Sequence, residues 1–302
     1  MVLLGDCSSS SSIQHKNDLY TKEQQRQVEN VGRIEKIKVR VHAPPETVTL
    51  LMNKDLSTPY DCARHAREHI LHRAALASVD SEVWEMYTPL VSNCELKFHY
   101  FDEENPEIPN TAFWESCSLI LGAVICRAFK DNVSVALHSY PTPDIRSGSF
   151  VYDAKLSLDD WKPIVDELRI LRAEMLTFCQ ENHKIECLRV NKEKALEILG
   201  DNPYKESQIL ALAAESPDGK VKLYRIDTHI DVARGPIISN TSFVNNCSIT
   251  AVHQIETDFG KLYRFQGIAL PKPLMVNIFL VEIKHIIIDK AKSFINSFSS
   301  TM

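Results

Sequence analysis

The stretch VKLYRIDTHIDVARGPIISNT occupies residues 221–241. Its first six residues predict a strand. A second stretch, AFWESCSLILGAVICRAF at 112–129, predicts a long and mostly apolar helix. One side of this helix is apolar along its length, and we interpret it as a side that faces a core rather than a membrane or a partner. It consists of Trp114, Cys117, Leu121, Val124 and Ala128.

A smaller unit is predicted before this helix. Residues 34–41, IEKIKVRV, alternate between apolar and charged side chains, which is typical of a half-buried strand. A second strand is expected at 47–52, and a helix at 57–78 that begins at Ser57 or Thr58 with Pro59 in its first turn. Short strands around 77–79, 83–84 and 95–100 complete the pattern. Two strands, a helix and further strands predict a small β-grasp fold.

The chain after residue 103 has a different pattern. A linker rich in Pro and Asn is expected at 104–110. Helices are then predicted at 111–131, 158–183 and 192–199, and in the tail from residue 272 to 302. Strands are predicted at 133–140, 148–156, 221–226, 248–256 and 263–270. The fold class expected for the whole chain is therefore α+β.

Composition excludes several classes of protein. The 302 residues include only nine glycines, and the closest two, Gly260 and Gly267, are seven positions apart. A dinucleotide-binding fingerprint or a phosphate-binding loop requires glycines that are closer together. The formal net charge of −6 argues against binding dominated by phosphate contacts over the whole surface. Eight cysteines without a Cys-x-x-Cys pair are expected to be reduced and mostly buried.

Two local motifs match residue patterns found in catalytic sites. His65, Glu68 and His69 fit the H-x-x-E-H pattern of inverted zinc peptidases, but no third ligand is evident, so we favour a solvated or RNA-facing helix side. His138-Ser139 with Asp144 has the residue types of a hydrolase triad. The nucleophile elbow is missing, and an ordinary loop is favoured.

Longer blocks resemble a known family. Residues 34–101, with STPYDCARHAR, ALASVDSEVWEMYTPL and NCELKFHYFD, resemble a TGS domain, a β-grasp module of threonyl-tRNA synthetases. Residues 111–270 resemble the editing domain of the same synthetases through AFWESCSLILGAVICRAF, GSFVYD, NKEKALEILGDNPYKE, VKLYRIDTHIDVARGPIISNT and YRFQGIALP. With HKNDLYTKE, MNKDLSTPY, FKD and LYRFQGIALP, the chain is identified as a member of the protein-thirty-nine family of the mitochondrial large ribosomal subunit.

The resemblance also implies a loss of catalysis. In the editing enzymes a His-Ser-x-x-His on the long helix faces a Cys-Arg-Gly-Pro-His turn, and such groups can position a water and move protons. Here the four polar positions are Glu115, Leu119, Ala233 and Ile237, whereas Ser116, Arg234, Gly235 and Pro236 remain. The hydrocarbon side chains are expected to fill the old cleft. No deacylation is therefore expected, and no aminoacylation, because the printed sequence ends where the synthetase catalytic domain would begin.

The function expected from the resemblance is a structural one. The chain would be a non-catalytic component of the mitochondrial large ribosomal subunit that binds its ribosomal RNA and neighbouring ribosomal proteins. No cofactor, metal or small-molecule substrate is expected. Two alternatives stay open: a freestanding tRNA-editing hydrolase and a non-ribosomal tRNA-binding regulatory module. RNA contacts are expected from three groups of basic residues: Lys36, Lys38 and Arg40; Arg64, Arg67 and Arg73; and Lys284, Lys290 and Lys292.

Four regions follow from these interpretations. Residues 1–30 are expected to be a flexible segment that is loose at its start, with a short helix at 18–30 left open. The segment has the Ser-richness of a mitochondrial presequence but no Arg before Arg26. A TGS-like β-grasp domain is expected at 31–103, an editing-like α+β domain with an antiparallel sheet at 108–270, and a helical tail at 271–302. The expected location is the mitochondrial matrix. No membrane span is expected, because the best stretch, 274–288, is short and contains charged residues.

Overall fold

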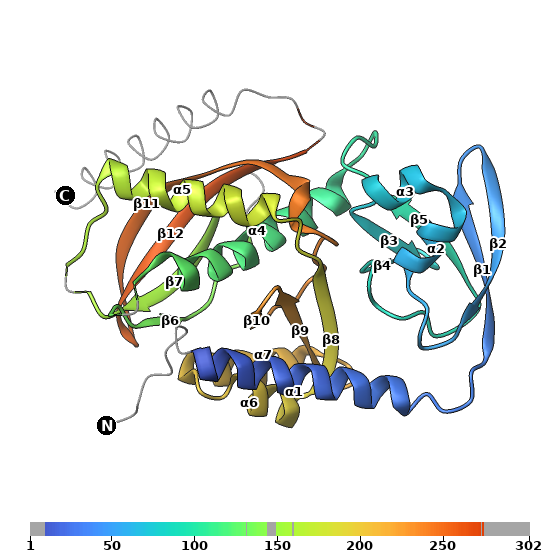
Figure 1. Cartoon of the computed structure of the whole chain (residues 1–302), viewed down its shortest axis with the longest axis horizontal. Coiled ribbons are helices and arrows are strands. Elements are labelled where there is room, and N and C mark those ends of the chain that lie inside the picture. The colour runs from blue at the N-terminus through green and yellow to red at the C-terminus, as the bar shows by residue number, and fades with distance from the viewer. Residues whose placement is uncertain (1–9, 131, 144–148, 159, 273, 275–302) are drawn as a thin grey trace, which may run out of the picture.

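The computed structural model describes residues 10–130, 132–143, 149–158, 160–272 and 274. Its strands form three sheets, each covered by helices (Figure 1). Every strand pair is antiparallel except β1 with β5. The structure confirms the predicted α+β class. The helical tail predicted from residue 272 lies almost entirely outside the described residues.

The first sheet has five strands in the order β2-β1-β5-β3-β4. On β1 the apolar side chains are buried and the basic ones exposed, as the alternation of 34–41 predicts. Helices α2 and α3 cover the inner face, with Cys62, Ala63 and Ile70 in the core. The bounds are β1 Lys36–Ala43, β2 Glu46–Asn53, α2 Pro59–Ala66, α3 Glu68–Arg73, β3 Leu76–Val79, β4 Glu82–Trp84 and β5 Cys94–His99.

The helix predicted at 57–78 is wrong in its extent. The start is as expected, since Thr58 and Asp61 form a capping box and Pro59 opens the helix. The backbone of Arg67 is extended and separates α2 from α3. The second helix ends at Arg73, because Ala75 donates its backbone N–H to His99 of β5 and the following residues join the sheet.

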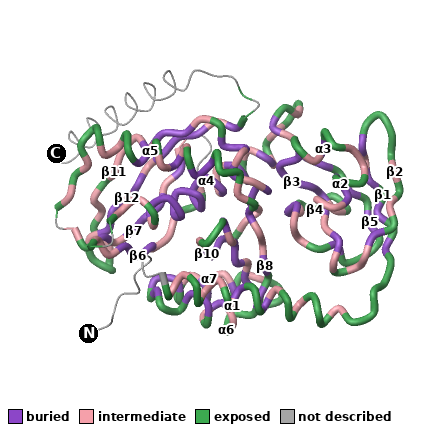
Figure 2. The backbone as a smooth tube through the Cα atoms, in the orientation of Figure 1, coloured by how far each residue is buried: buried purple, intermediate pink, exposed green. Residues whose placement is uncertain are grey.

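The second sheet has four strands in the order β11-β12-β7-β6, and helices α4 and α5 pack against it (Figure 1). Figure 2 shows buried residues along α4 and on the strands that it meets. The expected stripe of α4 is buried at Cys117, Leu121 and Val124. The bounds are α4 Glu107–Ala128, β6 Val135–Leu137, β7 Phe150–Leu156, α5 Val165–Gln180, β11 Val244–Thr257 and β12 Gly260–Pro271.

Two expectations about this region need correction. The linker predicted at 104–110 is shorter, because α4 already begins at Glu107. By length and composition α4 is also long and apolar enough to cross a membrane, contrary to the expectation that no stretch would be. However, 67% of its most apolar window is buried inside the fold, which is the pattern of a core helix.

The third sheet has three strands in the order β10-β9-β8 and is covered by α1, α6 and α7 (Figure 1). The sequence analysis found β9 and α6 but missed β8, β10 and α7. A short 3-10 helix, η1, leads into β11. The bounds are α1 Ser10–Glu29, β8 Ile185–Asn191, α6 Lys192–Leu199, α7 Pro203–Glu215, β9 Lys220–Ile226, β10 His229–Val232 and η1 Thr241–Phe243.

Helix α1 contradicts the flexible segment predicted for residues 1–30, at least from Ser10 onward. The side chain of Tyr20 is fully buried and belongs to the core of the third sheet. The Arg225 guanidinium lies over its ring, 4.3 Å from the centroid. Lys16 forms an ion pair of 2.7 Å with Asp201. Residues 1–9 lie outside the described part of the chain.

The first sheet is joined to the rest by buried contacts. Glu85, which follows β4, accepts hydrogen bonds from the Tyr224 hydroxyl and from Lys222 Nζ on β9. The backbone N–H of Ser239 bonds to the carbonyl of Ala75 (3.2 Å). Phe101, at the end of this unit, packs edge-on against Phe113 and Phe243. These contacts fix the position of the turn at 234–236 relative to α4.

Candidate functional site

The turn predicted at Arg234-Gly235-Pro236 lies against α4. Ser116 connects the two segments, because its hydroxyl donates to the carbonyl of Ala112 (2.5 Å) and accepts the backbone N–H of Ile238 (2.9 Å). Gly235 has φ +69°, and an added Cβ would overlap the Tyr224 hydroxyl. Ser116 and Gly235, two of the residues retained from the editing pattern, therefore have structural roles in this fold.

The four altered positions lie on α4 and around the turn, and three of them are buried. Leu119, Ala233 and Ile237 are 0%, 5% and 2% exposed, and all three belong to the main hydrophobic core. Such side chains cannot exchange protons or hold a water by hydrogen bonds. Only Glu115 of the four carries a titratable group.

Glu115 is half-buried and lines a pocket of about 300 Å³. Burial raises the pKa of its carboxyl to about 7, against the opposing influence of Tyr140 and Arg234 nearby. The buried Tyr140 hydroxyl faces Glu115 in this pocket. The Arg234 guanidinium is paired with Glu215 at 2.7 Å on the outside. The pocket is lined by Glu115, Tyr140, Pro141, Thr142, Gln208, Ala211, Leu212, Glu215, Val232, Ala233 and Arg234.

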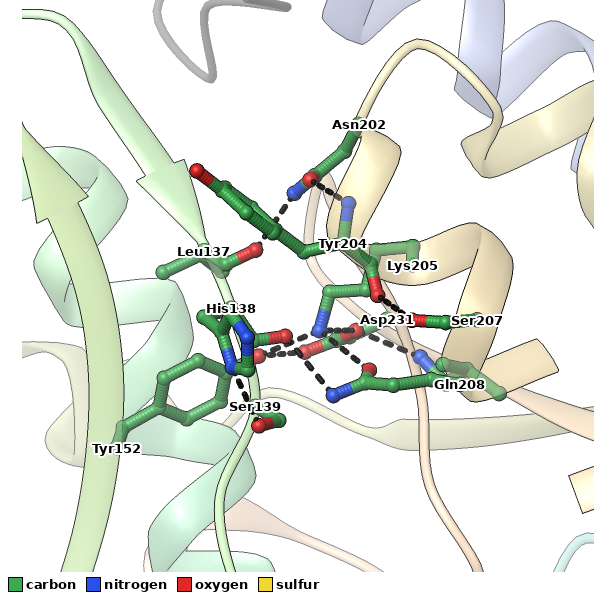
Figure 3. Close-up of polar contacts among 11 residues, drawn as sticks. Leu137, His138, Ser139, Tyr152, Asn202, Tyr204, Lys205, Ser207, Gln208 and Asp231 are labelled. Carbon is green, nitrogen blue, oxygen red and sulfur yellow. Dashed lines mark hydrogen bonds and ion pairs between the residues drawn. The ribbon is translucent and has the colours of Figure 1, made fainter. Parts of the chain in front are cut away.

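A buried polar cluster lies beside this pocket, and the sequence analysis did not identify it (Figure 3). Lys205 of α7 pairs with Asp231 of β10 at 2.7 Å, and both are almost fully buried. The Tyr152 hydroxyl donates to Asp231 (2.5 Å), and Lys205 Nζ donates to the same hydroxyl oxygen (2.8 Å). The backbone N–H of Val232 also donates to Asp231 (2.7 Å). Every member of the cluster is thus hydrogen-bonded within the protein.

Lys205 and Asp231 stabilise each other's charged forms in this cluster. Burial is the largest single influence on the pKa of Asp231 and raises it, but Lys205, His229 and Tyr152 together outweigh burial, and the net pKa is lowered. His229 is buried nearby, and burial lowers its pKa to about 4, so it is neutral at pH 7. A carboxylate that is already neutralised by a buried ammonium is a poor general base.

Further hydrogen bonds attach α7 to the second sheet (Figure 3). Asn202 donates its side-chain amide to the Leu137 carbonyl (2.7 Å), and Gln208 donates to the His138 carbonyl (2.9 Å). The ring of His138 meets the Ser139 hydroxyl at 2.6 Å. Asp144, the third residue of the possible triad, lies outside the described residues. The run 202–205, NPYK, contained a usable signal: Asn202 caps a helix that Pro203 opens.

The H-x-x-E-H motif is divided between two helices. His65 is on α2 and His69 on α3, and the extended Arg67 separates the two helices. Both imidazoles are exposed. Within the described ranges, no group of three or more His, Cys, Asp or Glu side chains is placed to hold a metal ion.

The basic residues predicted to contact RNA differ in their surroundings. Lys36, Lys38 and Arg40 are exposed on the outer face of β1. Lys36 donates to the side-chain oxygen of Asn53 (2.6 Å), and Arg40 forms an exposed ion pair with Glu95 at 3.1 Å.

The arginines of α2 and α3 are all close to carboxylates. The Arg64 guanidinium lies 3.5 Å from Asp61 and that of Arg67 3.7 Å from Glu46. Arg73 is bonded to Asp102. Their charges are therefore partly neutralised. Lys284, Lys290 and Lys292 lie outside the described residues.

One basic residue of the outer face was not predicted. Lys97 of β5 is exposed and stands beside His42 of β1 in the parallel register. Register places it on the same sheet face as Lys36, Lys38 and Arg40, because alternate residues share a face. The sequence analysis missed it because the pairing of β5 with β1 is not visible in the sequence.

Comparison with known proteins identifies the family. No protein-family model matches the chain. Over 272 residues the chain is 43% identical to the large ribosomal subunit protein mL39 of Drosophila melanogaster, a match that covers 89% of this chain and 81% of that protein. The chain belongs to the mL39 family. This confirms the resemblance to a ribosomal protein family. The residues at 115, 119, 233 and 237 should therefore be compared with those of mL39 proteins.

The mL39-type chain is also similar to threonine–tRNA ligases. It is 28% identical over 269 residues to the mitochondrial threonine–tRNA ligase 1 of Arabidopsis thaliana, covering 87% of this chain and 36% of that enzyme. It is 29% identical over 191 residues to the Thermotoga maritima enzyme, covering 63% of this chain and 28% of that enzyme. The chain spans about a third of the length of these ligases. This agrees with the threonyl-tRNA-synthetase-like resemblance.

Proposed function

We propose that this chain is a structural component of the mitochondrial large ribosomal subunit, where it contacts ribosomal RNA and neighbouring ribosomal proteins. The observation that supports the proposal is the 43% identity to mL39 over 89% of the chain. The extent of the match argues for a shared fold and a shared place of assembly. The proposed location is therefore the mitochondrial matrix.

Sedimentation tests this role. In a sucrose gradient of mitochondrial lysate, the chain should migrate with the large subunit and move to the monosome fraction when subunits are joined. A chain that stays at the top of the gradient, or is found outside mitochondria, would favour the tRNA-binding regulatory alternative.

We also propose that the chain does not catalyse deacylation. Leu119, Ala233 and Ile237 fill the contact between α4 and the turn with hydrocarbon, and Asp231 is neutralised by Lys205. Neither arrangement provides a free base beside an ordered water. The purified chain should not hydrolyse mischarged seryl-tRNA above the uncatalysed rate. Measurable turnover that is lost in Glu115→Gln would support the hydrolase alternative instead.

The proposed domains are a TGS-like β-grasp unit at 31–103 and an editing-like unit at 108–270. The first is supported by the antiparallel β1–β2 hairpin, the helices behind it, and the parallel pairing of β1 with β5. The second is supported by the identity to threonine–tRNA ligases across most of the chain. In this proposal both units act as shaped building blocks.

The proposed RNA contact is the outer face of the first sheet. Lys36, Lys38 and Lys97 lie there without a carboxylate partner among the described residues. Exposed ammonium groups of this kind bind phosphates and release counter-ions, so the contact should weaken with salt. The double variant Lys36→Glu/Lys38→Glu should leave large subunits at a lower salt concentration than the wild type. Lys22→Glu/Lys162→Glu, which changes net charge equally at exposed sites elsewhere, is the control.

A further inference from the structure

A groove of about 1290 Å³ lies between α1, the first sheet and β8. It shares no lining residue with the pocket beside Glu115. One wall is the end of α1 and the residues that follow it, from Glu23 to Val31. The second includes residues 84–91, from the last residue of β4 onward, and the third is β8 with the start of α6. In Figure 1 these three segments come from distant parts of the sequence. The groove is larger than typical small-molecule pockets, which favours a macromolecular occupant.

The third wall is the open edge of a sheet. Strand β8 pairs with β9 on one side only. Ile185 donates its backbone N–H away from β9, to the Ser239 carbonyl (3.0 Å), and the Arg189 carbonyl accepts from Gln27 on the same side (2.9 Å). Backbone groups two residues apart point to the same edge, so those of Cys187 point there as well.

The groups of Cys187 are the ones left open. Its N–H and carbonyl have no partner at this edge among the described residues, and the residue is only half-buried. The hydrogen bonds between β9 and β10 support the outward direction of the Cys187 backbone groups. The Lys222 carbonyl of β9 points toward β10, because it accepts the Ala233 N–H (3.5 Å). Alternate residues of β9 therefore face β8, opposite the even-numbered residues of that strand. An extended segment could bond to Cys187 from the groove.

The other two walls offer an apolar seat. The ring centroids of Tyr60 and Tyr87 lie 4.9 Å apart on the side of the first sheet, with the rings tilted by 38°. Val28 of α1 and Val91 after β4 both line the groove and are 54% and 52% exposed. Lys184 lies over the Tyr87 ring at 4.2 Å. Tyr60 and Tyr87 are partly buried, and Val28 and Val91 are exposed. Aliphatic and aromatic side chains of this kind form the centre of protein interfaces.

The charge of the groove argues for a protein and against a nucleic acid. Basic and acidic lining residues are equal in number, so the groove has no excess of positive charge to attract phosphates. Some already neutralise each other, such as Arg26 with Glu23 and Lys194 with Glu197. The basic ones are Arg26, Lys184, Arg189, Lys194 and Lys220, and the acidic ones are Glu23, Asp55, Asp61, Glu193 and Glu197.

We propose that this groove holds an extended segment of a neighbouring protein in the same ribosomal subunit. The segment bonds through its backbone to Cys187 and places an apolar side chain against Tyr60, Tyr87, Val28 and Val91. This is strand addition to a short sheet edge, with the side-chain seat giving specificity. The proposal rests on the proposed function, because the partner is a protein of the assembled subunit.

Hydrogen exchange at Cys187 tests the proposal. The exchange of backbone amides in 186–190 is measured in the purified chain and in purified large subunits that contain it. The Cys187 amide should exchange at least tenfold more slowly in the subunit. Equal rates in the two states overturn the inference. A chain that is absent from purified subunits overturns the proposed function instead, so the two failures are distinguishable.

Photo-cross-linking identifies the chemical class of the occupant. A photoreactive amino acid replaces Val28 or Val91 in chains assembled into large subunits, and Ile170, which is 64% exposed on α5, is the control position. Both groove positions should cross-link to the same short segment of one protein, and position 170 should not. Cross-links to RNA, or to two unrelated segments, contradict the proposal. The exposed substitutions Val28→Glu and Val91→Glu should abolish the slow exchange at Cys187, whereas Ile170→Glu should keep it.

Discussion

Gly235 is the residue at which the first sheet, β9 and the turn after β10 come together. Its positive φ is one that other L-residues rarely adopt, and its Cα faces the Tyr224 hydroxyl and the Glu85 carboxylate. An added Cβ would lie 2.8 Å from Glu85 Oε1. The glycine is thus required by both backbone conformation and space.

Gly235→Ala should therefore destabilise the chain by about 2–4 kcal/mol, which combines the left-handed backbone penalty with the displacement of Tyr224. Gly219→Ala is the matched control, because its φ is +65° but nothing lies within 4 Å of its added Cβ. The control should lose only about 1 kcal/mol. Urea unfolding of both variants measures the difference. Equal losses would show that the close approach to Tyr224 has no energetic weight.

Glu115 should give the stability of the chain a pH dependence. Its folded pKa of about 7 lies above the ordinary value of 4.5, so the folded state holds a proton that the unfolded state releases. Stability should therefore fall as pH rises from about 4.5 through 7. Glu115→Gln should remove this slope and become more stable than wild type at pH 8 by roughly 1–3 kcal/mol. The exposed Glu107→Gln on the same helix is the control, and an unchanged slope in Glu115→Gln would contradict the assignment.

At the scale of elements, α1 is part of the fold. It lies along the third sheet, where Asn17 donates to the Thr228 carbonyl (2.7 Å) and Arg225 reaches Thr21 (2.9 Å). Its fully buried residue is Tyr20, whose hydroxyl is buried without a partner among the described residues. The helix therefore depends on the ring for packing and gains nothing visible from the hydroxyl.

Two substitutions at Tyr20 should separate these contributions. Tyr20→Ala removes the buried ring and should cost about 3–5 kcal/mol. Tyr20→Phe removes only the unpaired hydroxyl and should be neutral or slightly stabilising. Thermal or urea unfolding measures both. A small loss in Tyr20→Ala would mean that α1 detaches easily and that the original expectation of a flexible segment holds in solution.

The sequence predicted most elements where periodicity or end signals were strong. The alternation of 34–41 and the apolar run of α4 were sufficient for β1 and the core helix. Strand β8, IECLRVN, was missed because its apolar and polar residues do not alternate strictly, and β10 is only four residues long. Helix α7 was missed although Asn202 and Pro203 mark its start.

The candidate site was predictable only in part. The altered positions 115, 119, 233 and 237 were found because two short motifs place them in order along the chain. The pairing of Lys205 with Asp231 was not, because it depends on how α7 packs against β10 and the residues are 26 positions apart. Likewise, the carboxylates near Arg67 and Arg73 are visible only in three dimensions, whereas Asp61 is three positions before Arg64 on α2.

At the scale of the whole molecule, Glu85 couples the first sheet to the third. Its buried carboxylate accepts from Tyr224 and Lys222, so the two units share a hydrogen-bond network. Coupling of this kind makes separate unfolding of one unit costly, because it leaves buried polar groups without partners. The two units should therefore unfold together.

Glu85→Ala should weaken that coupling. We expect a loss of about 2–4 kcal/mol, since the Tyr224 hydroxyl remains buried and unpaired. Hydrogen exchange of β1 and β9 at increasing urea should show one common transition in the wild type and two in the variant. Glu82→Ala, an exposed carboxylate on β4, is the control. A single transition in Glu85→Ala would show that other contacts carry the coupling.

The apolar packing between α4 and the turn also limits which substitutions the chain can tolerate there. Leu119 and Ile237 are now part of a close-packed core, so histidine at either position would be buried without a partner and destabilise the fold. A useful active site would need several such changes at once, each harmful alone. Any substitution that brings a proton-transferring group into this contact therefore costs folding stability before it can contribute to chemistry.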